Sequence, residues 1–337
     1  MVEVWTATAH VPGRAVALGQ AAEEGGFDGL SLGDTQHLAA DPYAGLAVVA
    51  RATERLGLLV GVTNPVTRHP AVTAAAIATV QVESDGRAVL GLGRGDSAVG
   101  RLGRPPAPVD DVLDYLLRVQ GYLAGEVVDA EGYPSEIPWI AASGQPKVPV
   151  DVAATGPRML TLGGRHAERV TVNVGAQPER VAWALDVARA AGEGRATPCS
   201  FGAYLVLAAH PDPVTARQLA IGPLAAYAHF SGMRGSPVEL LSPEDRSVIE
   251  AVTADYDLSA HGQRAARHTA HIDDAFVDRF GVVGPAAHCV ARLRELADLG
   301  LDRLVVVEGR DVAQPEEQRR AHRCLVEEVL PALHEGR

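Results

Sequence analysis

Short apolar strands alternate with helical patterns along almost the whole chain, and this alternation constrains the fold more than any other feature. Eight strands are expected, at residues 2–7, 29–32, 58–63, 88–92, 148–154, 170–174, 201–208 and 303–307. Most are apolar throughout, which is typical of parallel strands covered on both faces. Helices are expected at 14–24, 42–55, 70–83, 110–123, 156–166, 178–190, 285–299 and 315–333. The rhythm predicts an α/β fold, with a (β/α)8 TIM barrel favoured and an open doubly wound sheet as the alternative.

Two stretches interrupt this rhythm. Residues 124–146 are rich in Gly, Pro and Ser and are expected to form an excursion before the fifth strand. Residues 210–301 separate the seventh and eighth strands and are too many for an ordinary barrel connection. We therefore expect one domain over 1–337, with a helical insertion at about 210–301 that covers the barrel mouth.

The composition excludes several classes of partner. Thirty Lys and Arg against 42 Asp and Glu give a net charge of −12, and aromatic residues make up 4% of the chain. Nucleic acids and membrane surfaces are therefore not expected partners. Cys199, Cys289 and Cys324 lie far apart, which argues against disulfides and favours a cytoplasmic protein. The histidines lack paired metal-ligand spacing, so no metal is expected.

The end of the third strand is dense in polar groups. Residues 61–70 read GVTNPVTRHP, which puts Thr63, Asn64, Arg68 and His69 at the C-terminal end of a buried strand. One interpretation is a turn in which Asn-Pro redirects the chain and Pro70 starts a helix. The other is a backbone bulge toward a flat heteroaromatic ring, whose edge these groups would bind. Barrel enzymes carry their chemistry at this edge.

The junction after the fifth strand suits a phosphate. Residues 154–158 read ATGPR, with small residues before the proline that starts a helix and an arginine after it. Free N–H groups at a helix N-terminus and a nearby guanidinium both bind anions. An ordinary helix start is the other interpretation, but at the C-terminal edge of a barrel we favour phosphate.

Two further strand ends carry candidate catalytic groups. The fourth strand runs into Gly93 and Asp96, where the repeated glycines lack the full dinucleotide-binding spacing. Asp96 is expected either to cap the next turn or to face the barrel mouth. The second strand is followed by Asp34, Gln36 and His37, which are candidates for hydrogen bonding to a substrate or, for His37, for acid–base work.

Several of these segments together resemble the luciferase-like monooxygenase superfamily of (β/α)8 barrels. The similar blocks lie at residues 21–29, 63–70, 86–96, 153–160 and 280–284. The block at 63–70 leans toward the branch that uses the deazaflavin coenzyme F420, which includes methylenetetrahydromethanopterin reductase, over the FMN branch.

The resemblance implies a non-prolyl cis peptide at Gly61–Val62, which would mark a functional site. It also implies that the cofactor tail lies at residues 154–157 and that relatives dimerise through barrel-flank helices. Asp96 falls where related dehydrogenases carry a glutamate, and Asp34 matches their aspartate, although Thr35 follows it here in place of an active-site histidine. The candidate cofactor-binding residues are Gly61, Val62, Thr63, Asn64, Gly93, Ala154, Thr155, Gly156, Pro157, Arg158, Asn173 and Gly175.

Three hypotheses about function remain open from the sequence. The first is an F420-dependent oxidoreductase that moves a hydride between the deazaflavin C5 and a small organic substrate. Asp34 and Asp96 would handle the proton, while Gln36 and His37 would orient the substrate. The second is an FMN-dependent monooxygenase of the same superfamily. The third is a non-catalytic protein that binds F420.

Overall fold

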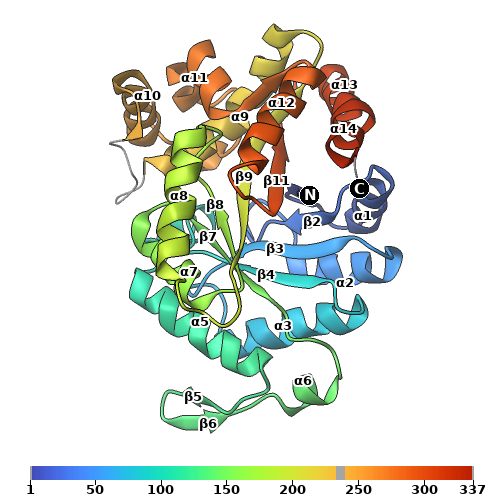
Figure 1. The fold of residues 1–337 in the computed structure, drawn as a ribbon, viewed down its shortest axis with the longest axis vertical. Coiled ribbons are helices and arrows are strands. Elements are labelled where there is room, and N and C mark those ends of the chain that lie inside the picture. Colours follow the sequence, from blue (N-terminus) through green and yellow to red (C-terminus); the bar gives the residue numbers. More distant parts are fainter. Residues whose placement is uncertain (1, 233–239, 336–337) are drawn as a thin grey trace.

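Eight parallel strands close into a barrel in this computed structural model, which describes residues 2–232 and 240–335. Each strand pairs with the next, and the pairings β11–β1 and β8–β9 complete the circle (Figure 1). The strands are β1 (Glu3–Thr8), β2 (Gly29–Leu32), β3 (Gly57–Thr63), β4 (Ala88–Leu92), β7 (Val150–Ala154), β8 (Arg169–Val172), β9 (Ser200–Ala209) and β11 (Arg303–Glu308). The TIM barrel is confirmed, and the open sheet is excluded because both edges are paired.

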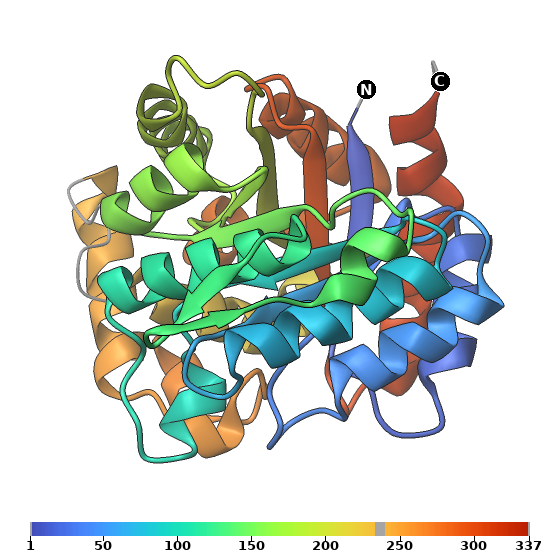
Figure 2. The ribbon, with the colours of Figure 1, turned by 90° about the horizontal axis from the view of Figure 1, so that it is seen from below.

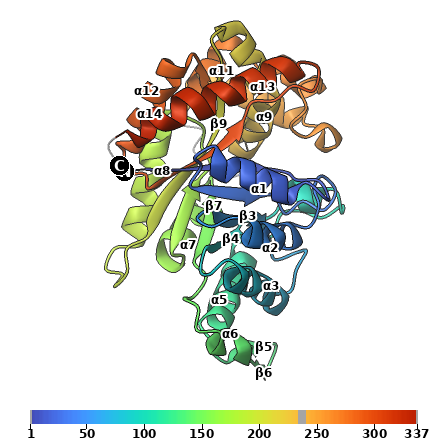
Figure 3. The same ribbon diagram turned by 90° about the vertical axis from the view of Figure 1, so that its right-hand side faces the viewer.

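Helices surround the barrel, and neighbours in the ring pack on one another (Figures 2 and 3). The main ones are α1 (Ala15–Glu24), α2 (Pro42–Ala52), α3 (Pro70–Glu83), α5 (Val109–Leu123), α7 (Pro157–His166), α8 (Pro178–Ala191) and α12 (Ala286–Ala297). After β11 the chain forms α13 (Pro315–Cys324), a π-helical turn (Leu325–Val329) and α14 (Leu330–His334). The single helix expected at 315–333 is therefore divided.

Two other boundaries differ from the expected ones for local reasons. The fifth barrel strand begins at Val150 rather than 148, since Pro149 has no N–H to give to the sheet. Helix α2 ends at Ala52 because Thr53 is extended, and the Arg87 guanidinium donates to the carbonyls of Ala50 and Thr53 at 2.8 and 2.9 Å. These carbonyls have no partner within the helix.

The barrel interior is filled at its N-terminal end. The Trp5 ring occupies the space that side chains at Gly29 and Gly57 would need. Beside it, the Asp151 carboxylate accepts from the Thr171 hydroxyl at 2.7 Å and pairs with Arg303 at 3.5 Å. A filled interior leaves the C-terminal strand ends as the place for a ligand.

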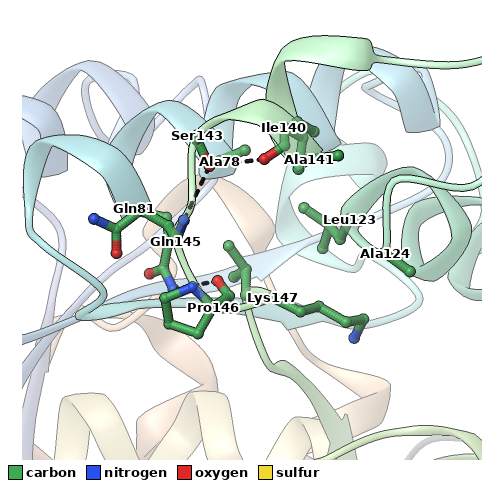
Figure 4. Close-up of a pocket in the computed structure, with 11 residues that line it drawn as sticks. Ala78, Gln81, Leu123, Ala124, Ile140, Ala141, Ser143, Gln145, Pro146 and Lys147 are labelled. Carbon is green, nitrogen blue, oxygen red and sulfur yellow. Dashed lines mark hydrogen bonds between the residues drawn. The ribbon is translucent and has the colours of Figure 1, made fainter.

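The excursion at 124–146 forms a small hairpin, β5 (Val128–Ala130) and β6 (Tyr133–Ser135), followed by α6 (Pro138–Ala142). It lies at the opposite end of the molecule from α10 and α11 (Figure 1). A pocket of about 140 Å³ opens between α3, α5 and α6 (Figure 4). Gln81 in its wall donates to the Pro146 carbonyl at 2.9 Å, and Lys147 pairs with Glu168 at 2.7 Å. Since these groups are engaged and lie near the N-terminal rather than the C-terminal ends of the barrel strands, the pocket is not the candidate site.

Between β9 and α12 the chain builds a separate helical layer. It contains α9 (Pro213–Ser231), α10 (Pro243–Ala254), two 3-10 turns (Leu258–Ala260 and Arg267–His271), α11 (Asp274–Phe280) and the short strand β10 (Val282–Gly284). Strand β10 lies alongside the end of β9 and pairs in parallel with residues 207–209. These helices share an apolar core with α9 at its centre. Helix α12 packs on the barrel itself. The insertion expected at about 210–301 therefore ends before α12.

Candidate functional site

The backbone at the end of β3 is irregular. The Gly61–Val62 peptide bond is cis, and the pairing with β4 shifts register between Val60 and Thr63. The cis bond expected from the resemblance is therefore confirmed. The bulge turns Val62 toward β4, where a Cβ at Gly91 or Gly93 would lie 2.9 Å from its methyl carbons. The β4 glycines thus make room for the bulge, a packing reason that the sequence did not reveal.

Polar groups beside the bulge lack a partner. The Asn64 Nδ2 and Thr67 Oγ1 atoms are buried and have no hydrogen bond in the part of the chain that is described, while the buried Thr63 hydroxyl lies next to that of Tyr43. Asn64 Oδ1 accepts from the N–H groups of Val66 and Thr67 at 3.0 and 3.1 Å. The turn interpretation of this segment is therefore correct, and it leaves the amide nitrogen free. Buried polar groups are usually paired, so this cluster points to a ligand.

An ion-pair network joins the loops after β2 and β3. The Arg68 Nε atom lies 3.1 Å from Asp34 Oδ2, and its Nη2 atom lies 2.6 Å from Asp41 Oδ2. The guanidinium also covers the Tyr43 ring at 4.5 Å. Burial, and then the charge of Asp34, raise the pKa of the Tyr43 hydroxyl, which keeps it protonated. Asp34 is thus a buried carboxylate with a fixed counter-charge.

The junctions after β7 and β8 lie side by side, because the Asn173 N–H donates to the Ala154 carbonyl at 2.9 Å. Helix α7 starts at Pro157, and no side chain of the described residues caps it, which leaves its first N–H groups open. Arg158 is exposed and lies 3.0 Å from Asp110. Asn173 Oδ1 is buried without a partner among residues 2–232 and 240–335. Gly175 has a φ of +82° and packs against Phe280, so its backbone and neighbours already require glycine.

The remaining predicted residues lie after β2 and β4. Gln36 and His37 are exposed, and the Gln36 amide donates to the Ala98 carbonyl at 2.8 Å, which ties the β2 loop to α4 (Ser97–Gly100). Asp96 precedes α4, but its side chain makes no capping bond with described residues. Its Oδ1 atom lies 3.6 Å from His229 Nε2, while its Oδ2 atom is buried without a partner in the described structure. Asp96 is therefore not used for capping.

Sequence reasoning missed the contribution of α9 to this site. Tyr227 packs against the apolar cluster inside the barrel, which includes Trp5 and Tyr204. His229 reaches Asp96 and stacks on the Tyr256 ring at 3.9 Å, and the Tyr256 hydroxyl bonds His261 Nδ1 at 2.7 Å. Burial lowers the pKa of His261 to about 4. Local sequence carries no signal for the contact between His229 and Asp96, because these residues lie more than a hundred positions apart in the chain.

The described residues contain neither a metal site nor a membrane-spanning helix. Within residues 2–232 and 240–335, no group of three His, Cys, Asp or Glu side chains is arranged to hold a metal ion. None of the helices in the described residues has the length and apolarity needed to span a bilayer.

The sequence pattern of the luciferase-like monooxygenase family matches residues 2–303 of this chain. The chain belongs to this family. The 5,10-methylenetetrahydromethanopterin reductase of Methanolobus tindarius is 30% identical to this chain, over 84% of this chain and 86% of its own length. The F420-dependent glucose-6-phosphate dehydrogenase of Microbacterium testaceum is 29% identical over 76% of this chain and 84% of its own length.

A solved structure shares the fold. The F420-dependent tetrahydromethanopterin reductase of Methanopyrus kandleri superposes with a TM-score of 0.74 and 21% identity, over 98% of this chain and 99% of that one. The same barrel fold therefore extends over essentially the whole chain.

Proposed function

We propose that this protein is an F420-dependent oxidoreductase that moves a hydride between the deazaflavin C5 and a small organic substrate. The observation that carries this proposal is the similarity, over more than four fifths of both chains, to a methylenetetrahydromethanopterin reductase. Relatives named as F420-dependent dehydrogenases support the choice of F420.

The residues present fit such a cofactor. Gly61 and Val62 would support one face of the ring, and the side chains of Thr63 and Asn64 would bind its polar edge. Gly93 faces Val62 across the bulge and would keep the ring pocket open. When bound, the deazaflavin supplies hydride chemistry at its C5 carbon.

The phosphate-bearing tail would lie at the start of α7. Thr155 and Gly156 are small, and Ala154 and Pro157 fix the backbone on either side of them. The open N–H groups there, together with the Arg158 guanidinium, suit a phosphate. Two residues of the neighbouring junction, Asn173 and Gly175, would line the same tail.

Of the two candidate carboxylates, Asp96 is better suited to exchange the proton that accompanies the hydride. Its Oδ2 atom has no partner in the described chain, whereas Arg68 neutralises Asp34. Asp34 would act as a fixed hydrogen-bond acceptor. Gln36 and His37, at the exposed rim, would orient the substrate.

Turnover with defined reductants tests the proposal. Reduced F420 should lose its electrons to one or more members of a panel of small ketones, aldehydes and imines, under anaerobic conditions. Oxygen consumption with reduced FMN, in place of this activity, would instead support the monooxygenase suggested by the family's name. Tight F420 binding without any transfer would support a binding protein.

We also propose that the protein is a homodimer in the cytoplasm. Apolar side chains of the neighbouring helices α2 and α3 are exposed, namely Val48, Val72 and Val82. The three cysteines are free, as in reducing compartments. Sedimentation equilibrium should give twice the chain mass, and a monomer at all concentrations would contradict the dimer.

A further inference from the structure

We propose that His229 and Asp96 form the proton-holding pair of this site, with Asp96 touching the substrate and His229 acting as a positioning residue through it. The inference rests on the proposed function, because it names the groups that supply the proton accompanying the hydride. The two residues come from different parts of the fold, the β4 loop and the insertion helix α9.

The Asp96 carboxylate is the first observation. Asp96 occupies the capping position of α4 but makes no capping bond within the described residues, and its Oδ2 atom is buried and unpartnered there. A buried carboxylate oxygen is normally hydrogen-bonded. Asp96 lies four residues after the end of β4, and a side chain at the neighbouring Gly95 would meet Asn64 of the bulge loop. The Asp96 carboxylate would thus meet a substrate that lies on the ring.

The His229 imidazole is the second observation. Its Nε2 atom is 3.6 Å from Asp96 Oδ1, and the two side chains are 16% and 20% exposed. The ring lies flat on Tyr256, with an interplanar angle of 4° and a centroid distance of 3.9 Å. Its Nδ1 atom is buried without a partner in the described chain. Stacking thus fixes the ring with one nitrogen toward Asp96.

The other titratable groups of this cluster are suited to remain uncharged. Tyr256 stacks on His229, His261 and His268 pack on the other sides of the Tyr256 ring, and the charges of Arg101 and Arg310 act on His261. Burial lowers the pKa of His261 to about 4 and also lowers that of His268. Burial, with the charge of Asp96, raises the pKa of Tyr256. His229 is therefore the imidazole of this cluster that faces Asp96.

The pairing implies a substrate class. In the reductive direction a hydride adds to the carbon of a polarised C=O or C=N bond, and a proton adds to its oxygen or nitrogen. The two electrons travel with the hydride, so oxidised F420 and reduced substrate balance the reaction. Asp96 gives the proton, His229 replaces it, and solvent reprotonates His229. Ketones, aldehydes and imines fit this scheme.

Histidine-ring NMR on the cofactor-free protein tests the pair without any substrate. In Asp96→Asn, the chemical shifts of the His229 ring signals should change, because the carboxylate oxygen 3.6 Å from His229 Nε2 is lost. Asp255→Asn is the matched control. It removes a carboxylate that lies 3.4 Å from another imidazole, that of His271, and should change the His271 signals instead of those of His229. Unchanged His229 signals in Asp96→Asn would overturn the pair.

Turnover separates a positioning role from a structural one. His229→Gln should lower kcat about 100-fold with little change in KM. His229→Gln should bind F420 as the wild type does, and His271→Gln should keep wild-type kcat. An unaltered kcat in His229→Gln would overturn the proposal. A wild-type protein that does not bind F420 would contradict the proposed function alone, since the NMR measurement reads the pair directly.

Discussion

Arg68 holds the Asp34 carboxylate, with its Nε atom 3.1 Å from Asp34 Oδ2. The same guanidinium reaches Asp41, so one side chain of the β3 loop fixes two carboxylates of the β2 loop. Asp34 is 6% exposed at its side chain and Arg68 is 21% exposed. The rim of the candidate site is therefore stabilised by a partly buried ion pair rather than by apolar contacts.

Arg68→Met should strongly destabilise the protein. It leaves the Asp34 charge buried without its partner, so the free energy of unfolding should fall by about 3 kcal/mol. Arg51→Met is the control, because Arg51 and Glu83 form an exposed pair at 3.8 Å that should contribute less than about 1 kcal/mol. Urea unfolding measures both variants. Equal losses of unfolding free energy in the two variants would contradict a larger contribution from the Arg68–Asp34 pair than from the exposed Arg51–Glu83 pair.

Stability should fall in mildly acidic solution because of His261. Burial lowers the pKa of His261 from 6.5 to about 4, so below pH 6.5 the unfolded chain binds this proton more readily than the folded protein does. The stabilisation present above pH 6.5 is therefore lost as the pH falls toward 4. His261→Gln should remove this part of the pH dependence in thermal denaturation, whereas His271→Gln should keep it. A wild-type slope in His261→Gln would contradict the burial of this imidazole.

Gly91→Ala should disturb the bulge. The new methyl would overlap the Val60 carbonyl oxygen and lie 2.9 Å from a Val62 methyl carbon. We expect a loss of about 1–3 kcal/mol in the free energy of unfolding, together with weaker F420 binding. Gly33→Ala is the matched change at the end of β2, where the nearest atoms are 3.8 Å away. Similar behaviour of the two variants would argue against the packing of Val62 on β4.

Arg158→Gln should weaken binding of F420 but not of a deazaflavin fragment that lacks the phosphate. A charge-assisted hydrogen bond contributes about 1.5–3 kcal/mol, so the Kd for F420 should rise at least about 10-fold. Arg165→Gln, in the last turn of the same helix, should leave both affinities unchanged. Equal weakening for F420 and the fragment would contradict a phosphate site at the start of α7.

The barrel was predictable because each of its strands is a local apolar run. All eight strands appear within a few residues of the expected bounds, as at β4 and β2. The hairpin β5–β6 and the strand β10 were not expected, since three-residue strands such as Val282–Gly284 leave too short a pattern. Their formation depends on partners elsewhere, β9 in the case of β10.

The site was predictable only where its residues follow a strand. Asp34, Asn64 and Asp96 could be proposed from that position alone. The role of Arg68 as the partner of Asp34 could not, because two loops must meet before the pair exists. His229 lies inside a helix of the insertion, and nothing in its own segment indicates that it reaches the β4 loop.

The most direct test of the account is a pair of fluorescence titrations of the purified protein, one with F420 and one with FMN, followed by Gly91→Ala and Arg158→Gln in the same assay. We predict saturable binding of F420 at one site per chain, much weaker binding of FMN, and loss of F420 affinity in both variants. Preference for FMN, or F420 binding that neither substitution weakens, would contradict a deazaflavin seated on the β3 bulge with its tail at α7.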